Sequence, residues 1–194
     1  METETRTFDV SIEIEKREEG AASIVGHAAV FNTLSENLGG FRERIAPGAF
    51  TESIQADDVR ALFNHDPNFV LGRNKAGTLD LTEDDQGLAI RISPPDTTFA
   101  RDLMVSMGRR DITQMSFGFT VMPDGQSWEE DADGMVIRTL RKVRLFDVSP
   151  VTYPAYPQTD VAVREMRAWL ETQTPIEQPW RTLLMRRRLA LIGP

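Results

Sequence analysis

The sequence predicts a mainly β fold with a few helices, of the α+β class. Three observations lead to this expectation. Apolar and polar residues alternate with a period of two over residues 8–14, 88–92 and 115–121, as in strands with one buried face. One internal segment, residues 97–109, has apolar residues at the four-residue spacing of a helix. The chain's 194 residues suffice for a domain with a full hydrophobic core.

Most of the expected elements in the first half of the chain are short strands joined by turns. We expect strands at residues 8–14, 24–31, 42–45, 59–63, 78–81 and 88–92. A charged turn at residues 16–20 follows the first strand, and Pro47 fits the first position of a short helix. The apolar strand at residues 59–63 places His65 just beyond its end.

The second half adds helices, two longer strands and a tail. The expected elements are a helix at residues 97–109, a strand at residues 115–121, an acidic loop at residues 124–134, a long strand at residues 135–148, a helix at residues 161–170 and a basic amphipathic stretch at residues 180–192. Thr97 or Thr98 can cap the first helix. We therefore predict a β-rich domain at residues 1–164 and a C-terminal helical tail at residues 165–194.

The composition argues against several functional classes. A net charge of -8 is unsuited to a general nucleic-acid surface, and no apolar run approaches the length of a membrane span. The chain has no cysteine, which excludes disulfides and thiolate chemistry. The acidic, polar N-terminus does not resemble a secretory signal, so we expect a cytoplasmic setting.

The sequence contains no convincing metal or cofactor motif. Two isolated histidines without cysteine argue against zinc. The acidic residues 129–134 lack the glycine and glutamate spacing of a calcium loop, and no glycine-rich phosphate loop is present. We predict no cofactor.

Ser116 and His65 are candidates for nucleophilic catalysis. Ser116 lies on the small, polar face of the expected strand at residues 115–121, and His65 is one of only two histidines. A serine activated by an imidazole, with a carboxylate orienting the imidazole, is the arrangement of a serine hydrolase. Each residue also has a structural interpretation, because Ser116 could be an ordinary strand serine and His65 an ordinary turn residue.

Asp147 is the candidate carboxylate. It ends an apolar strand, where an unpaired charge is costly. A salt bridge to Arg144 or Arg141 is the alternative explanation. The second histidine, His27, lies within an expected strand and has no polar partner nearby in sequence, so we interpret it as structural.

Five segments in order resemble the prohead serine proteases of tailed bacteriophages, a family distantly related in fold to the herpesvirus assemblins. These segments are residues 26–32, residues 43–50, residues 63–66 with 71–73, residues 115–119 and residues 147–155. The resemblance extends from about residue 8 to residue 163. It implies an antiparallel, β-barrel-like protease domain of the assemblin type.

The resemblance implies a role for each candidate residue. His65 would be the general base and Ser116 the nucleophile, while Asp147 occupies a position that is usually acidic in the family. The segment at residues 152–156 would supply oxyanion donors.

The resemblance also implies partners and a setting. The substrates would be the major capsid protein precursor, its scaffolding segment and the enzyme itself, inside the procapsid assembling in the host cytoplasm. A homodimer is expected by analogy, without nucleic-acid or membrane partners. The tail could dock to the capsid interior or could be a frayed, solvated C-terminus. The rival interpretation is a non-enzymatic assembly module that keeps the protease fold.

Overall fold

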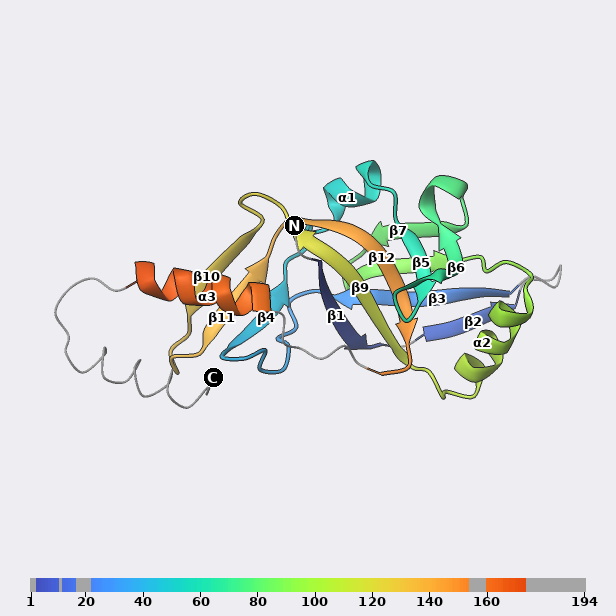
Figure 1. Cartoon of the computed structure of the whole chain (residues 1–194), viewed down its shortest axis with the longest axis horizontal. Helices are drawn as coiled ribbons and strands as arrows, with labels where there is room; N and C mark the ends of the chain where they lie inside the picture. The colour runs from blue at the N-terminus through green and yellow to red at the C-terminus, as the bar shows by residue number, and fades with distance from the viewer. Residues whose placement is uncertain (1–2, 11, 17–21, 154–159, 174–194) are drawn as a thin grey trace.

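The computed structural model describes residues 3–10, 12–16, 22–153 and 160–173. Within these residues, twelve strands form three sheets, joined by three α-helices and one 3-10 helix. The molecule is elongated, with two sheets forming a larger body and the third sheet forming a smaller one beside it (Figure 1). No helix among the described residues has the length and apolar character needed to cross a bilayer.

The largest sheet has five strands in the order β1–β9–β12–β5–β6. These strands are β1 (Glu4–Asp9), β9 (Gln114–Val121), β12 (Val143–Val151), β5 (Arg60–Phe63) and β6 (Asp66–Arg73). All neighbours pair antiparallel except β12 and β5, which are parallel. Strand β9 therefore has a hydrogen-bonded partner on each side.

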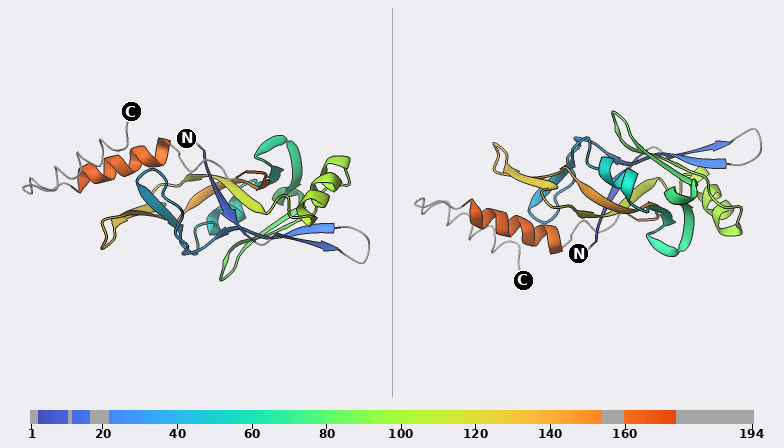
Figure 2. Two further views of the ribbon diagram at one scale, coloured as in Figure 1. Left: turned by 90° about the horizontal axis from the view of Figure 1, so that it is seen from below. Right: turned by 90° about the horizontal axis from the view of Figure 1, so that it is seen from above.

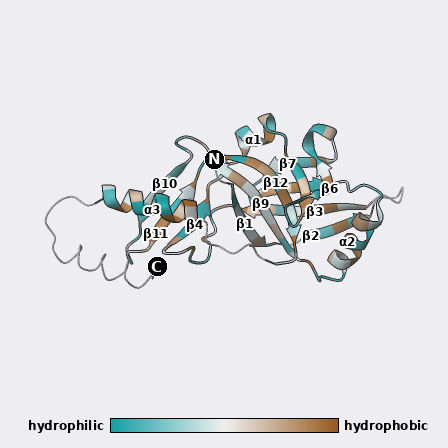
Figure 3. Cartoon of the chain, viewed as in Figure 1, coloured by the Kyte–Doolittle hydropathy of each residue, from teal (hydrophilic) through white to brown (hydrophobic). Residues whose placement is uncertain are grey.

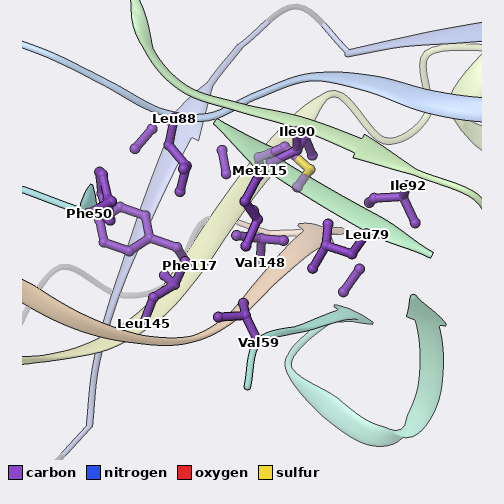
Figure 4. Close-up of a cluster of buried hydrophobic side chains, with 14 of the residues drawn as sticks. Phe50, Val59, Leu79, Leu88, Ile90, Ile92, Met115, Phe117, Leu145 and Val148 are labelled. Carbon is purple, nitrogen blue, oxygen red and sulfur yellow. The ribbon is translucent and has the colours of Figure 1, made fainter. Parts of the chain in front are cut away.

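The second sheet has four antiparallel strands in the order β2–β3–β8–β7. These are β2 (Ile12–Lys16), β3 (Ala22–Val30), β8 (Gly87–Ile92) and β7 (Leu79–Glu83). Buried side chains of this sheet and of the five-stranded sheet point toward one another and form the main core (Figure 4). Figure 4 shows Met115 and Phe117 of β9 packed between Val148 of β12 and Leu88 and Ile90 of β8.

The third sheet forms the smaller body with the C-terminal helix. Its order is β10 (Gln126–Glu130), β11 (Val136–Leu140) and β4 (Phe41–Ile45), with β11 and β4 parallel. Helix α3 (Asp160–Thr172) buries Ala162 and Met166 against Phe41 and Val136 in a second apolar cluster. The two views in Figure 2 both place α3 along this sheet.

The remaining helices are short. Helix α1 (Thr51–Ala56) packs on β12, and the 3-10 helix η1 (Asn74–Ala76) follows β6. Helix α2 (Thr98–Gly108) is capped at its N-terminus by Thr97, whose side chain accepts a hydrogen bond from the Ala100 N–H. The predicted cap is therefore confirmed. In Figure 3 the helices show mixed hydrophilic and hydrophobic faces, as expected where one face covers a sheet.

An ionic cluster, buried except at Glu165, joins the two bodies. It consists of Glu4 and Arg6 of β1, Glu43 of β4, Arg138 of β11 and Glu165 of α3. The Arg138 side chain is fully buried and donates hydrogen bonds to all three carboxylates at 2.8 to 3.1 Å. Its guanidinium also lies over the ring of Trp128, 5.4 Å from the centroid.

The fold confirms the mainly β prediction and corrects its details. The described strands form three open sheets and not a closed barrel, and two strand pairs are parallel. The expected strand at residues 8–14 is two strands, because the chain leaves the five-stranded sheet after Asp9 and enters the four-stranded sheet at Ile12. Alternation alone does not indicate which neighbour a strand pairs with.

Two further corrections concern residues 124–148. The predicted acidic loop contains strand β10, in which Trp128 packs edge-on against Phe41. The predicted long strand is interrupted at Arg141 and Lys142, whose backbone N–H groups both donate to the Gly125 carbonyl. This break separates β11 from β12, so they belong to different sheets.

The division into residues 1–164 and 165–194 stays a prediction. Helix α3 spans the proposed boundary, and the predicted turn at residues 16–20 and the basic stretch at residues 180–192 lie largely or wholly outside the described residues.

Candidate active site

His65 lies in a tight turn between β5 and β6. Asn64 and His65 both have positive φ angles, 53° and 58°, and Phe63 pairs with Asp66 across the turn. Two left-handed residues in a two-residue loop define the type I′ hairpin turn, and Asn and His tolerate this conformation better than most residues. The turn therefore fixes the direction in which the imidazole points.

Asn64 ties this turn to the end of β12. Its backbone N–H donates to the Pro150 carbonyl at 3.0 Å, and its side-chain oxygen accepts a hydrogen bond from the Thr152 N–H at 2.8 Å. Loop and strand are thus held together by backbone and side-chain contacts. Thr152 is consequently not a free oxyanion donor, although it was part of the segment from which donors were expected.

Ser116 lies on β9, an internal strand of the five-stranded sheet. It is directly opposite Thr7 of β1 and Ser149 of β12, and it is fully buried. The predicted apolar face of β9 is confirmed, because Met115 and Phe117 are also fully buried on the opposite side of the strand. Ser116, on the other face of β9, is also inaccessible to solvent. The alternation of apolar with polar residues did not predict this burial.

Asp147 reaches the Ser116 face because β12 contains a bulge. The register with β9 shifts between Leu145 and Asp147, leaving Phe146 as the extra residue. Both Leu145 and Val148 are fully buried, although they are three positions apart. Strict alternation would have turned Asp147 into the core with Leu145, whereas the bulge turns it to the other face. Asp147 lies within β12. The sequence had suggested that it ends a strand, and the structure corrects this expectation.

Helix α1 holds the bulged segment from the side. The Leu145 N–H donates to the Ser53 hydroxyl at 2.7 Å, and that hydroxyl donates to Asp57 at 2.7 Å. Asp57 also accepts a hydrogen bond from Arg144 at 3.2 Å. Arg144 is therefore paired with Asp57, which argues against the alternative in which it neutralises Asp147.

The structure brings His65, Ser116 and Asp147 into one hydrogen-bonded line. His65 Nε2 lies 2.7 Å from Ser116 Oγ, and His65 Nδ1 lies 2.6 Å from Asp147 Oδ1. A carboxylate oxygen can only accept, so the partners assign the proton to Nδ1 and leave Nε2 free to accept from the serine hydroxyl. This arrangement has the donors and acceptors needed to activate a serine.

The second histidine has a different environment. His27 Nε2 lies 2.8 Å from Asp84 Oδ2 at the edge of the four-stranded sheet. The hydrogen bond from His27, with those from the N–H groups of Gly87 and Gln86, lowers the pKa of Asp84. This partner is 57 positions away, so it was not visible in the local sequence.

Ser149 is a site residue that the sequence reasoning did not single out. Its hydroxyl donates to Asp147 Oδ1 at 2.6 Å, and the residue is fully buried. The available signal was the two-residue spacing from Asp147, because residues two apart in a strand share a face. Within the described ranges, no group of three or more His, Asp or Glu residues could hold a metal ion.

Comparisons with known proteins give the family of the chain and a protein of similar fold. A sequence model of the caudovirus prohead serine protease family matches residues 10–172. Among solved structures, the capsid assembly protease of bacteriophage T4 matches with a TM-score of 0.50 and 12% identity, covering 77% of this chain and 96% of that chain. At this identity the likeness shows a shared fold. No curated protein sequence matches significantly.

Proposed function

The chain belongs to the caudovirus prohead serine protease family, and on that premise we propose that it is a serine endopeptidase of capsid maturation. Ser116 is the nucleophile, His65 the general base and Asp147 the carboxylate that orients the imidazole. The observation that supports these roles is the line of two short hydrogen bonds from Ser116 through His65 to Asp147, at 2.7 and 2.6 Å.

The proposed reaction begins when the Ser116 oxygen attacks a peptide carbonyl carbon. His65 Nε2 takes the hydroxyl proton as the bond forms, and the positive charge on the ring is stabilised by Asp147. The same nitrogen then delivers the proton to the leaving amine, which leaves an acyl-enzyme on Ser116. A water molecule, deprotonated by His65, attacks the ester carbon. The bond from this carbon to the Ser116 oxygen breaks, His65 returns the proton to that oxygen, and the acid is released.

The oxyanion donors come from outside β9 in this proposal. Strand β9 pairs on both sides, so its backbone N–H groups are engaged in sheet hydrogen bonds. The Thr152 N–H is engaged by Asn64. We keep the expectation that the donors belong to residues 153–156, without Pro154, which has no N–H group. Residues 154–156 lie outside the described residues.

The proposed substrates are the major capsid protein precursor with its scaffolding segment, and the enzyme itself, inside the assembling procapsid. Family membership and the fold shared with a phage capsid assembly protease support this assignment. A homodimer stays a prediction that light scattering of the purified protein would test.

The proposal is tested with a fluorophosphonate, which reacts only with an activated serine. We expect labelling at Ser116, mapped by mass spectrometry, and no label at this position in Ser116→Ala. Turnover of the same variant should fall by about 10⁴-fold or more. Ser106→Ala, on the exposed face of α2, is the control and should label normally. Absence of label from the wild type would favour the non-enzymatic assembly module.

The substrate assignment needs a second experiment. The protein is co-expressed with the capsid precursor of the same phage, and the fragments are analysed by mass. We expect defined fragments with the wild type and none with Ser116→Ala. Fragments of equal abundance with both proteins would exclude Ser116 from the reaction.

A further inference from the structure

Four positions on β9 and β12 form a square on the active face of the five-stranded sheet. Ser116 lies opposite Ser149, and Gly118 lies opposite Asp147. Opposed residues on neighbouring antiparallel strands have side chains within contact distance, and so do residues two apart on one strand face. The square thus holds the nucleophile, the carboxylate, a second hydroxyl and one position without a side chain.

We propose that Ser149 and Gly118 are positioning residues that hold the Asp147 carboxylate where His65 needs it. This inference rests on the proposed function, because it assigns a role relative to that reaction. Neither residue touches the reacting atoms. Both act through Asp147, one by a hydrogen bond and the other by leaving space.

Ser149 acts on the oxygen that His65 uses. Its hydroxyl donates to Asp147 Oδ1 at 2.6 Å, and the His65 Nδ1 lies 2.6 Å from the same oxygen. Two donors on one oxygen fix the rotation of the carboxylate about its side-chain bonds. Hydrogen bonds to a charged acceptor in a buried site are stronger than neutral ones. Because Ser149 is fully buried, water cannot replace its hydroxyl without a structural change.

The contacts distinguish Ser149 from the nucleophile. The imidazole Nε2 lies beside Ser116, so only the Ser116 hydroxyl can pass its proton to the base. The Ser149 proton is committed to a carboxylate that is already hydrogen bonded to His65. Ser149 is therefore placed to orient and not to attack.

Gly118 supplies the space that the carboxylate occupies. A Cβ atom at this position would lie 2.5 Å from Asp147 Oδ2, which is closer than real Cβ contacts, and 3.4 Å from its Cγ. The backbone of Gly118 does not have a positive φ angle, so its conformation would accept alanine. The requirement for glycine is thus steric and comes from Asp147. This part of the small face of β9 is filled by the carboxylate.

The test measures the rate of fluorophosphonate labelling at saturation, kinact, and the half-saturating concentration, KI. In Ser149→Ala we expect kinact to fall about 10-fold to 100-fold with KI unchanged, because loss of orientation slows proton transfer without altering probe binding. Ser149→Thr keeps the hydroxyl and should recover most of the rate. Ser23→Ala, at another buried strand serine in the four-stranded sheet, is the control and should match the wild type.

Gly118→Ala tests the steric half of the proposal. We expect a fall in kinact of about 100-fold, since a displacement of about 1 Å at a catalytic group has effects of this size. Gly108→Ala is the matched control, because its Cβ would meet only Ile14 at an ordinary 3.6 Å. The thermal midpoint of every variant is measured, so that a folding defect is recognised.

The outcomes separate this inference from the proposed function. If the wild type is not labelled at Ser116, both fail. If the wild type is labelled and folded Ser149→Ala and Gly118→Ala react within about twofold of it, only the positioning role fails. Equal losses in Ser149→Ala and Ser149→Thr would overturn the part assigned to the hydroxyl. A loss confined to Ser149→Ala and Gly118→Ala supports the proposal.

Discussion

The protein contains two clusters of polar side chains, and they differ in the backbone that positions them. The ionic cluster joins Glu4, Arg6, Glu43, Arg138 and Glu165 from regular strands and one helix. The proposed active site joins His65, Ser116, Asp147 and Ser149. It depends on a left-handed turn and a strand bulge to do so. Irregular backbone is costly and persists where the surrounding structure holds it.

This difference indicates that the ionic cluster contributes mainly to stability and the proposed active site mainly to activity. In the ionic cluster every guanidinium faces carboxylates, so its contacts stabilise the joining of the two bodies. In the proposed active site, the hydrogen bonds run from Asp147 through His65 to the Ser116 hydroxyl, which gives up its proton in the proposed reaction. We therefore expect changes in the cluster to lower stability and changes in the site to lower activity.

The largest expected effect is on activity alone. His65→Ala removes the proposed base and should lower the fluorophosphonate labelling rate by about 10⁴-fold. The unfolding midpoint should change little, because the side chain is partly exposed. His27→Ala is the matched control: it loses a histidine–aspartate contact of similar length and should label like the wild type. Equal losses in both variants would contradict the assignment.

Arg138→Met should show the reverse behaviour. Removing this guanidinium leaves Glu4 and Glu43 buried with one of their two arginine partners, Arg6, still in place. We expect the lost contacts to cost about 3–5 kcal/mol of unfolding free energy. Chemical denaturation measures this loss, and the labelling rate of the folded fraction should be unchanged. Arg44→Met breaks an exposed pair with Glu129 and should cost less than about 1 kcal/mol. Similar costs in the two variants would contradict the comparison.

Ser53→Ala connects the two behaviours, because it acts on the bulge that orients Asp147. The Leu145 N–H loses its acceptor in a buried place, which should cost about 1–3 kcal/mol. Loosening the bulge should also reduce labelling by about 10-fold. Thr51→Ala, in the same helix but exposed, is the control. Loss of stability without loss of labelling would show that α1 does not position Asp147.

The smallest expected effect is on the unfolding free energy at acidic pH. Burial would raise the pKa of Glu4, but the hydrogen bonds and charges of Arg138 and Arg6 outweigh it and lower that pKa. The resulting stabilisation is complete above the ordinary glutamate pKa of about 4.3 and is lost as pH falls below it. The unfolding free energy measured from pH 6 to pH 3 should therefore fall less in Glu4→Gln than in the wild type. Parallel curves would exclude this contribution.

Local sequence patterns predicted the elements better than their partners. Strand β9 and helix α2 have clear periodicity, and the sequence located both of them closely. Strand β6 was not expected, because its exposed Phe69 and Val70 interrupt any alternation. The split of residues 8–14 between two sheets depends on long-range pairing that no local pattern encodes.

The site could be predicted only in part, again because long-range contacts are not visible in a local sequence pattern. Scarcity of histidine and the family resemblance indicated His65, Ser116 and Asp147, and the structure places these residues in contact. The bulge that turns Asp147 toward them was not predictable, because alternation places residues 143, 145 and 147 on one face. Ser149 was missed although its two-residue spacing from Asp147 places both on one strand face, because this spacing alone does not show that the two side chains are hydrogen bonded.

The complete burial of Ser116 has a consequence for access to the site. A hydroxyl enclosed in this way is not presented to a peptide, so the proposed attack requires a rearrangement that uncovers the oxygen. The same rearrangement must admit the fluorophosphonate, so the labelling rate of the wild type reports on this step as well as on proton transfer.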